Sequence, residues 1–220
     1  MKMNQYIDHT ILKASATEAD IRQLCEEAKE HQFFSVCINS CWVPLAASCL
    51  KGSPVKVCSV IGFPLGAMST EAKVFEAGNA VKQGADEIDM VINVGFLKSL
   101  KSDAVREEIR SVKKAVGAKT LKVIIETCYL DDEEKKTVCG LAVAAGADFV
   151  KTSTGFGTGG ATVDDVRLML DAVEGKAKVK ASGGVKDAET AQKYIEMGVM
   201  RLGTSNGIKI ISGETTTGGY

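Results

Sequence analysis

Short apolar runs alternate with longer amphipathic segments along the whole chain. The runs predict eight strands, at residues 6–12, 35–38, 56–61, 87–93, 121–126, 149–152, 178–181 and 201–203. Six of the segments between and after them show the period of a helix, at residues 17–30, 71–83, 103–116, 131–145, 162–173 and 187–197. In the first of these, Ile21, Leu24, Cys25 and Ala28 recur at the spacing of one helix face. Strict alternation of strand and helix predicts a parallel sheet covered by helices.

The number of units favours a barrel over an open sheet. Eight units of roughly 27 residues fill the 220-residue chain, as in a compact (βα)8 barrel. Gly84, Gly146 and Gly198 each precede a strand, where a left-handed glycine commonly ends a helix. An open doubly wound sheet is the alternative, but no strand is followed by the GxGxxG of a dinucleotide site, and the GFGTGG of residues 155–160 lacks that spacing.

No composition break divides the chain, so we predict one domain over residues 1–220, with a short flexible tail at about residues 212–220. That tail is too polar and glycine-rich to fold alone.

Composition narrows the function to small-molecule chemistry. With 27 Lys and Arg against 28 Asp and Glu, the net charge of −1 offers no basic face for nucleic acid or for an anionic membrane. The seven cysteines are odd in number and contain no CxxC pair, which favours free thiols in a reducing compartment. The sequence shows neither a signal peptide nor an apolar run long enough to cross a membrane. We therefore expect a cytoplasmic protein.

Three charged residues occur where the strand pattern calls for apolar ones. Strand periodicity points Asp89, Lys151 and Lys180 into the predicted barrel, near the carboxyl ends of strands four, six and seven. Lys178 has the same parity but lies deeper or before the strand, so we interpret it as structural. One reading of the three charges is an internal salt bridge that fixes strand register.

The other reading is catalytic. One carboxylate does not neutralise two ammonium groups, and a second cation lowers the pKa of a nearby lysine. A neutral lysine amine attacks a carbonyl carbon and forms an imine, which serves as an electron sink without a metal or another cofactor. The two histidines, His9 and His31, are a poor ligand set and suggest core roles.

Small residues follow the last two strands. Ser182, Gly183 and Gly184 follow the seventh strand, and Gly203, Thr204 and Ser205 end or follow the eighth. Glycine loops let backbone N–H groups approach an anion, and this corner of a barrel commonly holds phosphate. Together with the interior lysines, they indicate a phosphorylated carbonyl substrate.

Nearly end to end, the chain resembles the deoxyribose-phosphate aldolase family of class I aldolases. The resemblance rests on DEIDMVIN around Asp89, VIIET at residues 123–127, FVKTSTGF around Lys151, VKASGGV around Lys180 and RLGTS at residues 201–205. It implies a (βα)8 barrel without metal or cofactor that reversibly cleaves 2-deoxy-D-ribose 5-phosphate to D-glyceraldehyde 3-phosphate and acetaldehyde during deoxyribonucleoside breakdown. The family is often dimeric, so a homodimer is an expectation.

The resemblance also assigns roles to individual residues. Lys151 corresponds to the Schiff-base lysine, and Asp89 and Lys180 to the pair that donates and accepts protons. The substrate-binding positions are Asp8, Cys37, Thr152, Gly155, Gly183, Gly184, Gly203, Thr204 and Ser205, with Asp8 and Cys37 placed near the ends of strands one and two at the sugar. Some members end in a tyrosine that helps move the enamine proton, which Tyr220 matches. Some have a lysine after TSTG, where this chain has Phe156.

Two other functions remain open at this point. A different metal-independent barrel aldolase, or a transaldolase-like enzyme, would use the same imine on another phosphosugar. A non-catalytic barrel would bind a sugar phosphate through the glycine loops and keep Lys151, Lys180 and Asp89 as a structural ion cluster.

Overall fold

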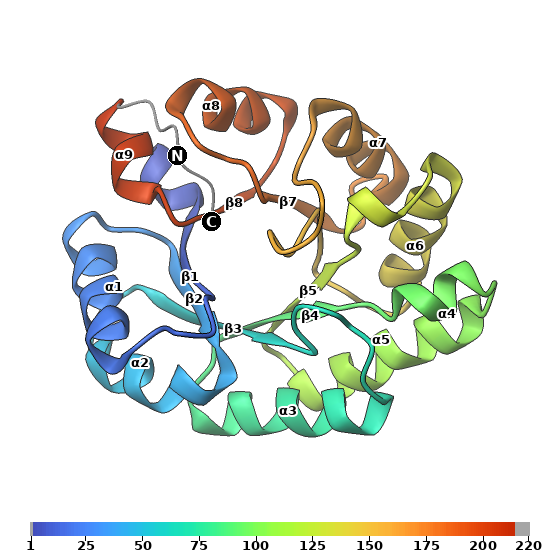
Figure 1. Ribbon diagram of the computed structural model, residues 1–220, viewed down its shortest axis with the longest axis horizontal. Helices are drawn as coiled ribbons and strands as arrows, with labels where there is room; N and C mark the ends of the chain where they lie inside the picture. The colour runs from blue at the N-terminus through green and yellow to red at the C-terminus, as the bar shows by residue number, and fades with distance from the viewer. Residues whose placement is uncertain (1, 214–220) are drawn as a thin grey trace.

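Eight parallel strands close into one barrel, as the sequence predicts (Figure 1). The computed structural model describes residues 2–213. Its strands are β1 (Ile7–Ile11), β2 (Ser35–Asn39), β3 (Lys56–Ile61), β4 (Glu87–Val91), β5 (Thr120–Ile124), β6 (Phe149–Lys151), β7 (Lys178–Ser182) and β8 (Arg201–Thr204). They pair in chain order, and β8 returns to pair with β1. The (βα)8 barrel is confirmed, and the open sheet is wrong.

Helices surround the barrel and cover the outer faces of its strands (Figure 1). The α-helices in residues 2–213 are α1 (Glu18–Glu30), α2 (Val43–Cys49), α3 (Thr70–Gln83), α4 (Val94–Lys98), α5 (Ser102–Val116), α6 (Asp132–Ala144), α7 (Val163–Val173), α8 (Ala188–Met197) and α9 (Gly207–Ser212). Short 3-10 turns lie at Met3–Tyr6, Ser40–Trp42 and Thr127–Tyr129. Periodicity missed α2, α4 and α9 because five to seven residues hold too few turns to repeat an apolar face.

Local sequence signals set the helix ends. The Thr17 side chain accepts the backbone N–H of Asp20, and the Asp20 carboxylate accepts that of Thr17, which makes a capping box at the start of α1. Gly84 ends α3 at a φ of 115°, a conformation that other residues rarely adopt. Ser212 is the last residue of α9, so the predicted tail starts one residue too early; its remaining part from residue 214 lies outside the described residues.

Alternate residues of each strand face opposite ways, and the two faces differ in chemistry. Outward residues such as Val36, Ile88 and Leu202 pack against the helices in one apolar core. Inward residues of β2 and β3 form a separate apolar cluster with a residue after β1 and one after β3, made of Leu12, Cys37, Cys58, Val60 and Phe63. The barrel interior therefore has an apolar wall on the side of β1 to β3, and this wall faces the charged residues of the later strands.

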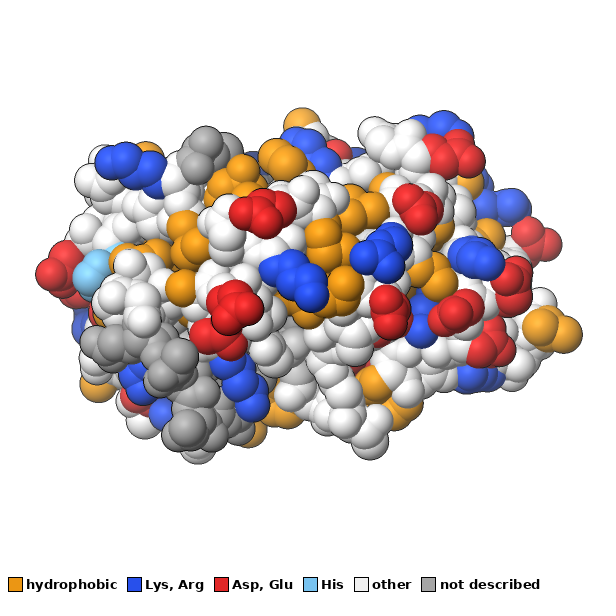
Figure 2. All heavy atoms as spheres, turned by 90° about the horizontal axis from the view of Figure 1, so that it is seen from above, with side chains coloured by type: hydrophobic (Ala, Val, Ile, Leu, Met, Phe, Trp, Pro, Cys, Tyr) orange, Lys and Arg blue, Asp and Glu red, His pale blue; other side chains and the backbone are white. Residues whose placement is uncertain are grey.

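The outer surface carries charges of both signs. On the face shown in Figure 2, acidic and basic side chains alternate over apolar and neutral ones, and no single-sign field forms. Among residues 2–213, no helix has both the length and the apolar character needed to cross a bilayer.

One buried ion pair lies outside the barrel interior. Lys73 of α3 and Glu108 of α5 form it at 2.9 Å, and both side chains are inaccessible to solvent. The Lys73 Nζ also donates to the carbonyl of Val91 at the end of β4, and Glu108 accepts the N–H of Asn93. The pair therefore holds two helices to the carboxyl end of β4, beside the strand that carries Asp89.

We predict that Glu108→Ala lowers the free energy of unfolding by about 3–5 kcal/mol, because it leaves the Lys73 ammonium buried without its partner. Replacing both residues, as Lys73→Met with Glu108→Leu, should cost much less than the sum of the single changes, since no isolated charge remains. Urea unfolding of the parent, Glu108→Ala, Lys73→Met, Glu108→Leu and the double variant measures this. A Glu108→Ala loss no larger than that of the exposed control Glu133→Ala on α6 would contradict the role given to the pair.

Candidate active site

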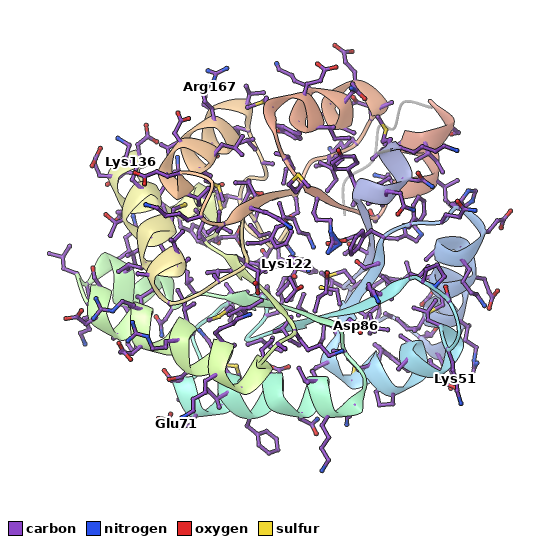
Figure 3. The ribbon with its side chains drawn as sticks, turned by 180° about the vertical axis from the view of Figure 1, so that it is seen from behind. Lys51, Glu71, Asp86, Lys122, Lys136 and Arg167 are labelled. Carbon is purple, nitrogen blue, oxygen red and sulfur yellow. The ribbon has the colours of Figure 1, made fainter. Side chains whose placement is uncertain are left out.

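The Asp89 carboxylate lies at the centre of the barrel interior and binds three lysines. Its Oδ2 accepts hydrogen bonds from the Nζ of Lys151 at 2.9 Å and of Lys180 at 2.8 Å. Its Oδ1 accepts one from the Nζ of Lys122 at 2.8 Å. The side chains of Asp89, Lys122 and Lys180 are fully buried. Their mutual contacts confirm the inward orientation of Asp89, Lys151 and Lys180. Lys122, which is labelled in Figure 3, is a fourth member that the sequence reading missed.

The ion cluster extends beneath Asp89 through further buried charges. Lys180 forms a second ion pair with Asp8 at 2.5 Å, and Asp8 also pairs with Arg201 at 2.5 Å. Lys122 pairs with Glu87 at 2.6 Å, and Arg201 also bonds to Glu87. The Arg201 guanidinium lies over the Phe34 ring, 3.4 Å from its centroid. The cluster thus holds four cations and three carboxylates, which corrects the expected one carboxylate and two ammonium groups.

Strand parity carries the signal that could have identified the missed members. Glu87 lies two residues before Asp89 on β4, so it faces the same way. Lys122 on β5 is paired in register with Asp89. Both therefore point inward, but the sequence reading followed only those charges that lie near a strand's carboxyl end.

Mutual pairing fixes the charges of the cluster. Burial alone would raise the pKa of Asp89, but Lys122, Lys151 and Lys180 hold it well below its ordinary value. Burial alone would lower the pKa of Lys180, but Asp8 and Asp89 raise it above its ordinary value. The resting site therefore contains an Asp89 carboxylate and a Lys180 ammonium.

Lys151 differs from the other two lysines in its number of partners. Among residues 2–213 it pairs with one carboxylate, Asp89, whereas Lys180 pairs with two and Lys122 with three. Its side chain keeps 3% exposure, against none for Lys122 and Lys180. Releasing a neutral amine therefore breaks fewest ion pairs at Lys151.

Lys178 is exposed and lies over the Phe149 ring at 5.5 Å, outside the cluster, as its structural reading expects.

Two predicted sugar contacts lie lower in the barrel than expected. Asp8 is the second residue of β1, not its end, and its Oδ1 accepts the Ser35 hydroxyl and the Arg201 guanidinium. Asp8 therefore belongs to the ion cluster under Lys180, which corrects its placement at the end of strand one. Cys37 is the central residue of β2 and forms part of the apolar wall. The signal missed here is distance from the strand end, because β1 ends only at Ile11.

The loops after β6, β7 and β8 are bound to one another at the barrel mouth. Thr152 donates its hydroxyl to the Ser182 carbonyl and accepts the Ser182 N–H. The Thr204 hydroxyl donates to the Val185 carbonyl at 2.9 Å. Gly203 lies in β8, where an added Cβ would come within 3.1 Å of the Lys180 Cε. Thr152 and Thr204 therefore fix the positions of the loops, and the lack of a side chain at Gly203 leaves room for Lys180.

The remaining predicted loop residues lie at the barrel mouth, where Gly183 is buried, Gly155 is partly exposed, and Gly184 and Ser205 are exposed. Gly183 and Gly184 have φ values of 77° and 83°, which only glycine adopts without strain. Gly155 and Ser205 line a cavity of about 540 Å³, together with Leu12, Lys13 and Phe156. Leu12 belongs both to this lining and to the apolar wall. The Phe156 ring meets the Phe63 ring edge-on at 5.4 Å.

The residues that could ligate a metal are already engaged. In residues 2–213, Cys37, Cys58 and Asp89 are the group whose ligand atoms lie within 4.8 Å of one another. Three ammonium groups already bind Asp89, which opposes the approach of a further cation. His9 lies outside the barrel, where it bonds to Glu27 of α1 at 2.7 Å and burial lowers its pKa.

Comparison with known proteins assigns the family. The family model described as DeoC/LacD family aldolase matches residues 2–213. The chain belongs to this aldolase family. The aldolase is 57% identical to deoxyribose-phosphate aldolase of Streptococcus uberis over all of both chains, and 58% identical to that of Finegoldia magna over 97% of this chain and all of the relative. Its fold matches the deoxyribose phosphate aldolase of Aeropyrum pernix, described as a unique tetrameric structure, with a TM-score of 0.87 at 32% identity, covering 96% of this chain and 89% of that one.

The family assignment fixes the class of enzyme. The chain is a lyase of the aldolase type on a (βα)8 barrel. The reading as a non-catalytic sugar-phosphate barrel is therefore wrong.

Glu126, to which the sequence analysis assigned no role, holds the loop that follows Lys151 in this aldolase. Glu126 follows β5 with a φ of 53° and a ψ of 69°, the left-handed region that non-glycine residues rarely occupy. Its carboxylate accepts the backbone N–H of Thr154 at 3.1 Å and also the Thr154 hydroxyl. Burial raises the pKa of Glu126. An added Cβ on Gly157 would come within 3.2 Å of the Glu126 Cδ. The strained backbone thus aims one carboxylate at the segment after the candidate nucleophile.

We predict that Glu126→Ala destabilises the aldolase more than Glu126→Gly. Both variants lose the two bonds to Thr154, but glycine also relieves a left-handed strain of about 1 kcal/mol, whereas alanine keeps it. Glu126→Gln, which keeps an acceptor oxygen, should lose least. Urea unfolding midpoints of the four proteins check the order. If Ala proved as stable as Gly here, the backbone strain assigned to Glu126 would be wrong.

Proposed function

We propose that this aldolase reversibly cleaves 2-deoxy-D-ribose 5-phosphate to D-glyceraldehyde 3-phosphate and acetaldehyde through an imine on Lys151. The observation that supports this mechanism is the number of ion pairs at each lysine. Lys151 pairs with one carboxylate, whereas the other two lysines of the cluster pair with two or three. The names of full-length relatives above 50% identity support the substrate.

The chemistry needs no reagent beyond water and the lysine. The Lys151 Nζ adds to the C1 aldehyde, and the carbinolamine loses water to give a protonated imine. Loss of the proton from the C3 hydroxyl breaks the C2–C3 bond, which releases glyceraldehyde 3-phosphate and leaves the two-carbon enamine on Lys151. Protonation at C2 and addition of water release acetaldehyde and restore the amine.

Asp89 and Lys180 supply the proton transfers of this scheme. The pKa directions make Lys180 the donor and Asp89 the acceptor in the resting site. Lys151 and Lys180 both donate to the same Asp89 oxygen, Oδ2, so a proton lost by Lys151 has a short path to the pair. The charge that Lys151 loses as a neutral amine leaves three cations against three carboxylates in the cluster.

We assign the phosphate to the mouth beside the β7 and β8 loops. Gly183, Gly184 and Ser205 offer backbone N–H groups there, and Thr204 holds the two loops together. Gly155 lines the cavity of about 540 Å³ that Ser205 also lines. Phe156 stands where some relatives place a lysine, so phosphate binding rests on backbone groups to a greater extent.

Other sequence-based expectations stay predictions. A role in deoxyribonucleoside breakdown, a cytoplasmic location, independence from metals and a homodimer belong to this group. Seven free cysteines fit a reducing compartment. Tyr220, the predicted helper in enamine protonation, lies outside the described residues.

Replacing Lys151 tests the proposed function. Lys151→Met should lower the release of acetaldehyde from 2-deoxyribose 5-phosphate by at least about a thousandfold, because the group that forms the imine is gone. Lys178→Met, on the neighbouring strand but outside the cluster, should retain most activity. Coupled assays for acetaldehyde and glyceraldehyde 3-phosphate measure both products. Activity of the parent on another phosphosugar, with none on this one, would favour the transaldolase-like alternative.

A matched pair of glycine variants tests the phosphate site. Gly184 and Gly175 share a left-handed φ, and an added Cβ at either meets no atom within 4 Å, but Gly175 lies before β7, at the other end of the barrel. We expect Gly184→Ala to raise the KM for 2-deoxyribose 5-phosphate by about tenfold, since strain displaces N–H groups that bind a charged ligand. Cleavage of unphosphorylated 2-deoxyribose should change little. Equal KM changes in Gly175→Ala would remove the phosphate assignment.

A further inference from the structure

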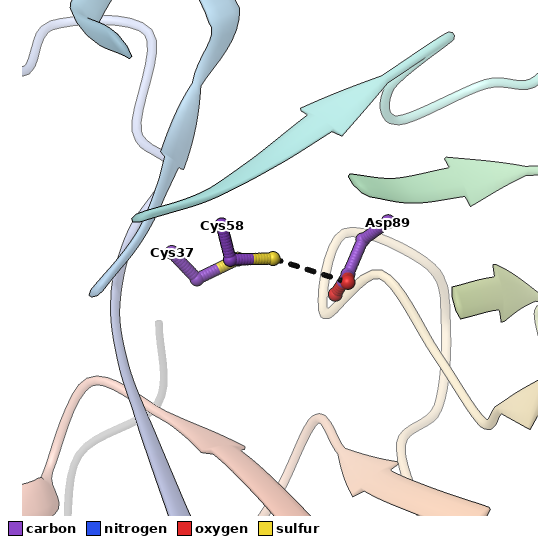
Figure 4. A group of neighbouring side chains, drawn as sticks. All are labelled: Cys37, Cys58 and Asp89. Atoms are coloured by element: carbon purple, nitrogen blue, oxygen red, sulfur yellow. Dashed lines mark hydrogen bonds between the residues drawn. The ribbon is translucent and has the colours of Figure 1, made fainter. Parts of the chain in front are cut away.

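Two cysteines face Asp89 from the apolar wall of the barrel. Cys37 on β2 and Cys58 on β3 are paired in register, and their sulfurs and an Asp89 carboxylate oxygen lie within 4.8 Å of one another (Figure 4). Both side chains are fully buried, and both thiols are free. The Cys58 Sγ lies 3.1 Å from the Asp89 Oδ1 and 3.3 Å from the Lys122 Nζ. The pair therefore touches the same carboxylate that binds Lys151.

We propose that Cys37 and Cys58 form a redox modification site, in which a peroxide converts the two thiols to a disulfide and thereby inhibits the aldolase reversibly. The inhibition rests on the proposed function of the Asp89 cluster. The disulfide itself rests only on the placement of the two sulfurs.

The surroundings make the two cysteines unequal. The pKa of Cys37 is lowered to about 7 chiefly by the adjacent Cys58 and also by Lys180, against the effect of burial. Burial and the thiolate character of Cys37 raise the pKa of Cys58. Cys37 is thus the thiolate that a peroxide oxidises, and Cys58 is the thiol that resolves the product.

The reaction balances with a peroxide as the only co-reactant. The Cys37 thiolate attacks one peroxide oxygen, the O–O bond breaks, and Cys37 becomes a sulfenic acid while hydroxide leaves. The Cys58 sulfur then attacks the Cys37 sulfur, the S–O bond breaks, and water forms from the departing oxygen and the thiol proton. Two thiols and one hydrogen peroxide thus give one disulfide and two waters, and the sulfurs supply both electrons.

The geometry of β2 and β3 allows a disulfide between Cys37 and Cys58 and makes that disulfide easy to reduce. Register partners on neighbouring strands lie about 4.8 Å apart, within the Cα range of disulfides. Their side chains leave the sheet in parallel, so closing the bond strains it, and strained disulfides are the readily reduced ones. This suits a regulatory bond better than a structural one.

Hydrogen peroxide can reach the two buried cysteines by the path that the substrate takes. Lys151 is almost as buried as the cysteines, with 3% exposure, yet an aldehyde sugar must reach it. Hydrogen peroxide is smaller than that substrate and can follow the same path. Two other buried cysteines, Cys25 and Cys139, are less reactive as thiols, because burial raises the pKa of each to about 12. Oxidation inside the protein should therefore select Cys37 and Cys58.

The disulfide removes the Cys58 S–H donor from Asp89 and draws its sulfur toward β2. Asp89 then loses one of the four groups that hold its Oδ1 and Oδ2. A carboxylate that is less firmly held transfers protons to and from the Lys151 intermediates less effectively. The expected result is a lower kcat.

The test uses the full chain with the three partly or fully exposed cysteines replaced, as Cys41→Ser, Cys49→Ser and Cys128→Ser. This protein is treated with hydrogen peroxide, the remaining thiols are alkylated, and peptides are mapped by mass spectrometry. We expect a cross-linked pair of peptides containing Cys37 and Cys58, a loss of kcat of about tenfold or more, and recovery of both thiols and activity with dithiothreitol. Further variants with Cys37→Ser or Cys58→Ser, each compared with its own untreated sample, should form no such cross-link and show no recoverable loss.

Each other outcome decides against part of the proposal. Absence of the cross-link, with Cys37 and Cys58 still alkylated after peroxide treatment, overturns the modification site. A cross-link without loss of kcat overturns the inhibition. If the reduced protein does not cleave 2-deoxyribose 5-phosphate, the proposed function fails instead, and the mass spectrum still decides whether the disulfide forms.

Discussion

The attraction between one carboxylate and three lysines organises the interior of this barrel. Asp89 accepts hydrogen bonds from Lys122, Lys151 and Lys180, and each of these groups would be expensive to bury alone. Because the charges depend on one another, the strands that carry them must keep their register. The closed barrel supplies that register, since it leaves no edge at which a strand could slip.

The barrel interior is divided into an apolar part and a charged part, and this division determines what chemistry the cluster can perform. Inward residues of β2 and β3, with Leu12 and Phe63, form an apolar wall, and the rest of the interior, which includes Asp8 of β1, carries four cations and three carboxylates. Lys151 is the ammonium group of this cluster with the fewest carboxylate partners, because it pairs with Asp89 alone. Lower in the barrel, Glu87 pairs with Lys122 and Asp8 pairs with Lys180, which favours the charged form of each lysine, and Arg201 binds both carboxylates. The same network therefore stabilises the fold and leaves one lysine available for covalent chemistry.

The sequence predicts most of this structure because its signals are local or periodic. Short apolar runs place every strand to within two residues, and strand parity turns Asp89, Lys151 and Lys180 inward. The Thr17 and Asp20 spacing gives the start of α1. Helices such as α4 and α9 are too short for periodicity to show. Asp8 was misplaced although the predicted strand of residues 6–12 already puts it near the strand start, because its placement followed the family resemblance and not its distance from the strand end. The backbone of Glu126 is left-handed only because tertiary bonds to Thr154 stabilise it, so no propensity indicates it.

The central claim is that Lys151, and no other lysine of the cluster, forms the imine. The most direct measurement is reduction of the protein with borohydride in the presence of acetaldehyde, followed by peptide mass spectrometry, with borohydride alone as the control. The account predicts one N-ethyl-lysine, at Lys151. An N-ethyl group at Lys180 or Lys122 with Lys151 unmodified, or no adduct in a protein that releases acetaldehyde from 2-deoxyribose 5-phosphate, would contradict it.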